Sequence, residues 1–282
     1  MDTKRTTVVK TRRKNANHLR LLSSLLFLIF YSSCSSYIYV RTPSTRHISP
    51  EAQGKSFAGE VNVFLSQGQS AGVDLSKDKT GEPLDMDVEN SLGNRTSNLI
   101  GLNATMGLID RLDIFLLGNG NSYPTLIGLK AQLLGERKIN AKKGNHSLSL
   151  TVASGSTQGT QENDEATELV PKDDEASVEL TISSTDMGVI YGYRPGENFL
   201  LYLGYNLTRV NFEGVLEAKS VNLNGKTIQR DGISKGAHLG VFHYISKNFQ
   251  LKYEIAHQDA DWDNTKRSTS ESLSVGIGYR WQ

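Results

Sequence analysis

The C-terminal segment carries the feature that most restricts the fold, a strict alternation of apolar residues with small or polar ones. Residues 272–281 read SLSVGIGYRW, and the apolar face consists of Leu273, Val275, Ile277, Tyr279 and Trp281. Successive side chains of a β-strand point to opposite faces, so this pattern predicts a strand with one apolar face. Such a face packs on the core of a soluble sandwich or faces lipid in a membrane barrel. The remainder of the chain has to separate these two structures.

Nine further segments with period-two patterning precede this strand, and no helical pattern interrupts them. They lie at about 57–66, 97–108, 112–116, 124–136, 145–156, 177–194, 199–208, 237–242 and 251–256. Ten strands are an even number, which brings both ends of a barrel to the same side of a membrane. The connections also alternate in length, with short links such as IDRL and ISKN and longer polar links at about 67–96, 157–176, 214–230 and 262–270. Tight turns on one side and long loops on the other are typical of membrane barrels.

One segment departs from simple alternation. In 177–194 the apolar positions begin at Val178, Leu180 and Ile182 and then change parity, so that Met187 and Val189 follow. One residue inserted near Ser184 to Asp186 produces such a change. The pattern therefore predicts a β-bulge, or two separate short strands.

The second face of the predicted strands carries charged residues. Lys130, Lys252, Glu254 and Arg280 share the parity of the serine, threonine and glycine positions. In a sandwich these residues face water, whereas in a barrel of this size they fill the lumen and need partners. We expect a polar lumen cluster of these four residues, with Lys252, Glu254 and Arg280 pairing across the last two strands. Tyr191, Tyr193, Phe199, Tyr279 and Trp281 are expected to form an aromatic girdle at the rim with the short turns.

The first 33 residues have the composition of a signal peptide. Seven basic residues precede the apolar run LLSSLLFLIFY at 21–31, which is too short to span a bilayer as a helix. The motif YSSC that follows resembles the lipobox of bacterial lipoproteins, although Tyr31 stands where leucine is usual. This resemblance predicts lipidation of Cys34, the single cysteine of the chain. The alternative is an ordinary signal peptide with an incidental cysteine.

Removal of the signal peptide changes the charge of the chain. Residues 1–33 hold seven positive charges and one negative charge, so the formal net charge changes from +1 to −5. A net-acidic exported chain is a poor nucleic-acid binder. Residues 34–56, rich in serine, proline and arginine, are expected to be a lipidated cysteine and its tether, followed by a barrel domain at 57–282.

These residues together resemble those of small outer-membrane β-barrel proteins of bacteria with a double membrane. The predicted fold is all-β, an antiparallel up-and-down transmembrane β-barrel of about ten strands. The mean hydropathy of −0.38 agrees with it, because barrel strands alternate lipid-facing and lumen-facing residues. The resemblance implies that the alternating residues 273–281 are the assembly signal read by the barrel-assembly machinery, although Gln282 follows the terminal aromatic residue. It is a resemblance to an architecture, so it implies no activity.

Candidates for chemistry are few. His257 and Asp259, in HQDADWD, combine a base with carboxylates, and outer-membrane proteases of the omptin type place such residues at the barrel mouth. The paired motifs of those proteases do not align here, and a solvated strand end explains the segment equally well. No GxSxG or HExxH motif occurs, so the sequence predicts no cofactor and no metal.

The favoured function is a non-enzymatic, lipid-anchored outer-membrane barrel with a structural or surface-interaction role through its long loops. Both termini are expected in the periplasm, and the expected partners are outer-membrane lipid, lipopolysaccharide and the barrel-assembly machinery. Two alternatives remain at this point. One is a barrel hydrolase acting at the outer rim, and the other is a periplasmic lipoprotein with a β-sandwich or lipocalin-like fold.

Overall fold

The computed structural model describes residues 38–40, 45–68, 71–73, 97–118, 124–162, 176–218, 225–262 and 268–282. The signal peptide and Cys34 lie outside these residues, as does most of the acidic stretch at 157–176. The described strands are β1 (Ile38–Val40), β2 (Gly59–Gly68), β3 (Ala71–Val73), β4 (Ser97–Ile109), β5 (Leu112–Gly118), β6 (Leu126–Leu134), β7 (His146–Glu162), β8 (Ala176–Gly196), β9 (Phe199–Ala218), β10 (Lys226–Tyr244), β11 (Phe249–Trp262) and β12 (Ser268–Trp281). No helix in these ranges is long and apolar enough to cross a membrane.

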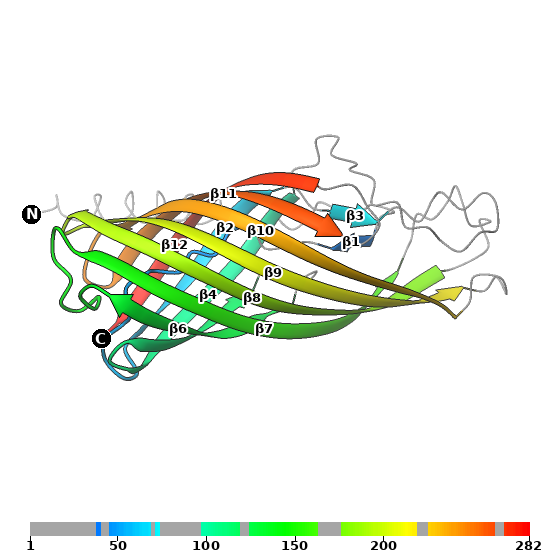
Figure 1. Cartoon of the computed structure of the whole chain (residues 1–282), viewed down its shortest axis with the longest axis horizontal. Coiled ribbons are helices and arrows are strands. Elements are labelled where there is room, and N and C mark those ends of the chain that lie inside the picture. The colour runs from blue at the N-terminus through cyan, green and yellow to red at the C-terminus, as the bar shows by residue number, and fades with distance from the viewer. Residues whose placement is uncertain are drawn as a thin grey trace, which may run out of the picture. The chain divides into compact units, whose positions relative to one another are not determined.

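Ten of these strands form one closed antiparallel barrel, in the order β2, β4 to β12 and back to β2 (Figure 1). The predicted fold class is therefore confirmed. The closing pair is β2 with β12, in which Val63 lies opposite Ile277 and Leu65 lies opposite Val275. Closure leaves neither strand with a free edge along this pair, so the terminal strand identified from its alternation shuts the barrel.

The two faces of the wall have opposite character, and the outward face is apolar. Leu203, Ile255, Leu273 and Ile277 are each more than half exposed, while Tyr202, Glu254 and Ser274 between them are buried in the lumen. In a soluble barrel the apolar face of the wall points inward to the core. In this barrel the apolar face points outward and the polar face points inward, as in a membrane barrel. The lipocalin-like and sandwich alternatives are therefore wrong.

The extent of the apolar belt can be followed along β9. On β9 it extends from Phe199 to Leu207, beyond which the exposed Arg209 pairs with Asp231 of β10 at 3.3 Å. Eight intervals of about 3.3 Å, tilted by about 40°, give a belt about 20 Å tall, close to that of transmembrane barrels. At the short-turn end of the barrel, exposed aromatic residues border the belt, including Phe199, Phe249, Tyr279 and Trp281.

The bulge expected near Ser184 to Asp186 is not present. β8 pairs with β9 without interruption from Ala176 to Tyr193, and its register shifts only after Tyr193. Ile182, Asp186 and Ile190 all face the lumen, so the parity is constant. The apolar pattern changes because the belt ends near Met187. Beyond the belt the outward face becomes polar, while Ile182 and Val210 pack inside the barrel mouth.

Strands β7, β9 and β10 are longer than the sequence pattern predicts. β7 extends to Glu162 and β9 to Ala218, and they pair with β8 and β10 throughout this added length. The predicted loops at 157–176 and 214–230 are therefore partly strand. Beyond the belt the outward face of β9 carries the exposed Arg209, Asn211 and Glu213, so the outward apolar pattern that marks the belt is lost there.

The expectation that residues 34–56 form a tether does not hold for the described part of that stretch. Residues 45–54 run inside the barrel, and each of them is buried. We call residues 45–54 the lumenal strap. It reverses at the short-turn end, where Phe57 N donates to Gly107 O at 2.9 Å, and the chain then enters β2. The lumen is consequently filled by a polypeptide segment as well as by side chains.

A charge in the middle of the outward belt tests the membrane-facing assignment. Leu203→Arg places a cation at mid-belt, and we expect it to lower the free energy of unfolding in lipid vesicles by about 2–4 kcal/mol. Phe199→Arg is the matched control at the belt edge, where the expected cost is about 0–1 kcal/mol. Urea unfolding followed by gel mobility measures both. Equal costs at the two positions would contradict the assignment.

Candidate functional site in the barrel lumen

The lumen contains a balanced set of buried charges. Among the described residues, five buried cations face five buried carboxylates: Arg46, Lys130, Lys138, Arg194 and Lys252 with Glu51, Glu60, Asp113, Asp186 and Glu254. Charges removed from water are tolerated only when they are paired and hydrogen-bonded. The strap supplies one residue of each sign, Arg46 and Glu51, so it is part of this balance.

The first residues of the strap, 45–47, are its upper part, and two carboxylates of the wall hold it. The guanidinium of Arg46 lies 2.6 Å from Asp186 and donates to Thr208 at 2.9 Å. Glu254 accepts hydrogen bonds from two successive strap amides, Arg46 N at 2.6 Å and His47 N at 2.8 Å. One carboxylate therefore accepts from two buried backbone amides that bond to this side chain in place of a neighbouring strand.

Two lysines bind the carbonyl groups of the strap. Lys130 Nζ donates to Ser49 O and Glu51 O, each at 2.9 Å, and lies 2.8 Å from Asp113. Lys252 Nζ donates to His47 O at 2.9 Å. An ammonium group offers three donors, which suits several carbonyl oxygens of an extended chain. The strap backbone is thus bonded to wall side chains in place of a neighbouring strand.

Residues 51–54 are the lower part of the strap, and an ion pair with two hydrogen bonds fixes it. Arg194 contacts both oxygens of Glu51, through Nε at 2.7 Å and Nη2 at 2.5 Å, and its guanidinium also lies 4.8 Å from the centre of the Tyr244 ring. Ala52 N donates to Gln132 at 2.8 Å, and Gln53 N donates to both oxygens of Asp113. A bidentate arginine–carboxylate pair fixes orientation as well as charge.

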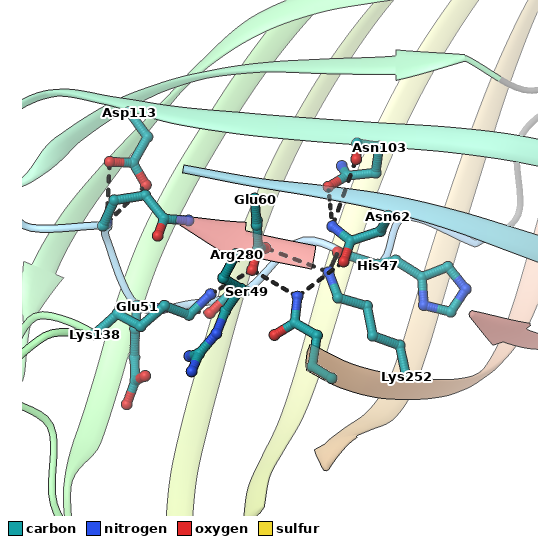
Figure 2. A network of polar contacts seen from close by, with 12 residues as sticks. His47, Ser49, Glu51, Glu60, Asn62, Asn103, Asp113, Lys138, Lys252 and Arg280 are labelled. Carbon is teal, nitrogen blue, oxygen red and sulfur yellow. Dashed lines mark hydrogen bonds and ion pairs between the residues drawn. The ribbon is translucent and has the colours of Figure 1, made fainter. Parts of the chain in front are cut away.

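Glu60 links three side chains at the short-turn end (Figure 2). Its carboxylate accepts from Lys138 at 2.7 Å, Gln250 at 2.8 Å and Lys252 at 3.3 Å. Lys138 belongs to the turn between β6 and β7. Burial lowers the pKa of this lysine, while the charge of Glu60 acts in the opposite direction. Glu60 is the carboxylate on which the two lysines depend.

The path of the strap requires an unusual backbone at its lower end. Gly54 has φ +80°, and a Cβ there would lie 2.7 Å from Cβ of Arg137. A side chain at this position would therefore clash in addition to adopting a disfavoured conformation. His47, within the strap, also has a positive φ of 49°, which its contacts with Glu254, Lys252 and Ser274 hold in place.

Three of the four residues expected in the lumen cluster are buried there. Lys130, Lys252 and Glu254 are at most 1% exposed. The expected pairing of Lys252, Glu254 and Arg280 is not what the structure shows, because Lys252 pairs with Glu60 and Glu254 binds the strap. Arg280 is partly exposed at the short-turn rim. It donates to Lys247 O at 2.7 Å and lies 4.5 Å from the centre of the Tyr244 ring.

The other predicted site residues lie outside the lumen. His257 and Asp259 are on the outward face of β11, just beyond the long-loop edge of the belt, with Nε2 and Oδ1 3.5 Å apart. The His257 side chain is 54% exposed, so no enclosed site surrounds it. The predicted assembly signal is the outward face of β12, where Leu273, Val275, Ile277, Tyr279 and Trp281 are all exposed. Cys34 lies outside the described residues.

Sequence reasoning missed the partners that the strap brings to the wall. Arg46, Glu51 and the backbone of residues 46–53 show no periodicity, since the strap has no regular face to bury. Glu60, Asp113 and Asp186 were available as lumen-parity carboxylates, and two of them pair with the predicted lysines, Glu60 with Lys252 and Asp113 with Lys130. The predicted cluster holds three cations, Lys130, Lys252 and Arg280, against the single carboxylate of Glu254, and this imbalance was the signal that could have identified the missing partners.

Comparisons with known proteins give a likeness of fold only. No family model and no curated protein matches the sequence. Solved structures similar to this chain include Neisserial surface protein A, with 13% identity, a TM-score of 0.36 and coverage of 80% of this chain and 97% of that chain. Ail of Yersinia pestis shows 11% identity, a TM-score of 0.35 and coverage of 80% and 100%. The outer membrane protease OmpT of Escherichia coli shows 10% identity, a TM-score of 0.39 and coverage of 80% and 94%. At these values no activity passes from them to this chain.

Removing the Glu60 charge tests the buried network. Glu60→Gln keeps the shape but leaves Lys138 and Lys252 without their shared carboxylate, so we expect the free energy of unfolding to fall by about 3–5 kcal/mol. Glu197→Gln, in the exposed turn before β9, is the control, with an expected change within about 0.5 kcal/mol. Urea unfolding in vesicles compares the two. Similar small effects for both variants would show that the network does not stabilise the fold.

Proposed function

We propose that this protein is an outer-membrane β-barrel, anchored additionally by lipid on Cys34, that acts through its long-loop end in a structural or surface-interaction role and does not conduct solutes. The observation that carries the proposal is the combination of an apolar outward belt with a lumen filled by the strap. The belt fits a bilayer, and in the outer membrane it is strands in a closed barrel that span.

A filled lumen argues against a pore. Porin barrels have roughly 16 or more strands, and their lumen contains an aqueous channel. Here ten strands enclose a strap whose backbone is bonded to Lys130, Lys252 and Glu254. Opening a path requires separation of Arg46 from Asp186 and of Glu51 from Arg194, each of them a buried pair. The strap therefore supports a closed barrel.

The long-loop end supports a role outside the membrane. Beyond Arg209, β9 continues for nine residues to Ala218, about 30 Å of strand at about 3.3 Å per residue. It remains paired with β8 and β10, so a four-stranded sheet of β7 to β10 extends past the belt (Figure 1). A rigid extension of this kind positions loops away from the bilayer, where they meet other molecules. The proposed partners at the membrane are lipid, lipopolysaccharide at the outer rim, and the barrel-assembly machinery acting on β12.

Fractionation of cells tests both anchors. We expect the wild-type protein in the outer-membrane fraction, with heat-modifiable gel mobility and incorporation of labelled palmitate. Cys34→Ser should lose the palmitate label but stay in the outer-membrane fraction, because the belt alone retains the barrel. A soluble periplasmic Cys34→Ser protein would contradict a membrane-spanning barrel, whereas a labelled one would contradict lipidation at this residue.

Planar-bilayer recordings test the closed lumen. The wild-type protein is expected to give no stepwise conductance. The double variant Arg46→Ala and Glu51→Ala removes both charges of the strap and should give measurable openings, because the strap loses its two ion pairs. Glu197→Gln serves again as the control without openings. Regular porin-like steps from the wild-type protein would refute the non-conducting role.

A further inference from the structure

The lumenal strap has a direction along the barrel. On β8, whose numbering increases toward the short-turn end, Arg46 contacts Asp186 and Glu51 contacts Arg194, eight residues further down. On β6, Lys130 binds Ser49 O and Glu51 O, and Gln132, nearer the short-turn end, binds Ala52 N. At the other extreme, Thr45 donates to Ser66 near the long-loop end of β2. The strap therefore runs from the long-loop end to the short-turn end.

A second observation places the chain before the strap at the same end. β1 pairs with β3, with Ile38 opposite Val73 and Val40 opposite Ala71. β3 begins three positions after Gly68, the long-loop end of β2, and Figure 1 shows the β1–β3 pair at the end of the barrel opposite the C-terminus. The direction of the strap and the position of β1 thus both place the chain before the strap at the long-loop end, and the two observations depend on different contacts.

We propose that the chain is threaded through its own barrel, so that its mature N-terminus lies on the long-loop side of the membrane and the lipid on Cys34 inserts into the leaflet on that side. Cys34 is four residues before Ile38, a reach of at most about 14 Å. The lumen holds the strap and its paired charges, which leaves no second passage back to the short-turn side. In an outer-membrane barrel the long-loop side is the cell surface, so the lipid belongs to the outer leaflet.

This inference rests on the proposed function for the presence of a lipid, and it reverses the expectation that the N-terminus is periplasmic. The ten strands do place both ends of the barrel wall at the short-turn end, since Gly59 lies opposite Trp281. The strap then carries the preceding chain back to the opposite end. Because its ion pairs are buried, the barrel has to close around the strap, which makes threading part of assembly.

An epitope inserted after Ser36 tests the side on which the N-terminus lies. Antibody added to intact cells is expected to bind this protein, and a second protein with the epitope after Lys247, in the turn between β10 and β11, is expected to bind antibody only after permeabilisation. The reverse pattern would overturn the inference. Heat-modifiable mobility and fractionation of the same proteins report on the proposed function separately, since a folded outer-membrane barrel with a hidden Ser36 epitope refutes threading alone.

A disulfide in the purified, detergent-folded protein gives a second test that is independent of cellular location and of lipid. In a Cys34→Ser background, Thr45→Cys with Ser66→Cys places two thiols at a position where the native hydroxyl groups are 3.3 Å apart. Oxidation should abolish thiol labelling in this pair. The control pair, Thr45→Cys with Ser147→Cys near the short-turn end of β7, should keep both thiols reactive. Cross-linking of the control pair in place of the first would mean that the strap runs in the opposite direction.

Discussion

The structure depends on the charge balance inside the lumen. Five cations and five carboxylates are buried there among the described residues, and the strap contributes Arg46 and Glu51 to the two sets. A charge in such a place costs several kcal/mol unless it is paired, so neither the wall nor the strap is satisfied alone. Asp186 and Glu254 require the upper strap, and Arg194 requires Glu51. The barrel and the segment before it are therefore one folding unit.

This arrangement explains why a chain of low mean hydropathy forms a membrane-type wall. Apolar side chains are placed on the outward face of a belt about 20 Å tall, and nearly all polar groups of the belt region turn inward. A lumen of ten strands is too wide for wall side chains such as Ser149 and Ser274 to fill, and the strap occupies the remaining space. Ser149 and Ser274 in fact bind it, through Pro50 O at 2.5 Å and His47 Nε2 at 2.6 Å.

The sequence was sufficient for the parts of the fold that repeat. Alternation located the ten barrel strands and the outward face of β12, and loop lengths separated the two ends. Alternation failed outside the bilayer, where no lipid requires apolar residues on the outward face. The outer parts of β7, β9 and β10 lack a continuous lipid-facing apolar pattern, so the predicted strands stop short of them, and the change of apolar parity after Ile182 marks the end of the belt in place of the predicted bulge. The strap has no period because its backbone bonds to side chains such as Lys130 and Lys252, which lie far from it in sequence.

The same reasoning accounts for the site. Lys130, Lys252 and Glu254 were identified by parity, but their partners are set by three-dimensional contacts with residues 46–53 and with Glu60, which no spacing reveals. Amide hydrogen exchange of the folded protein in micelles tests the central claim most directly. The account predicts that the amides of Arg46, His47, Ala52 and Gln53 exchange as slowly as those of the barrel strands. Exchange of these four amides at the rate of an unprotected peptide, while the strand amides stay protected, would show that the strap does not occupy the lumen.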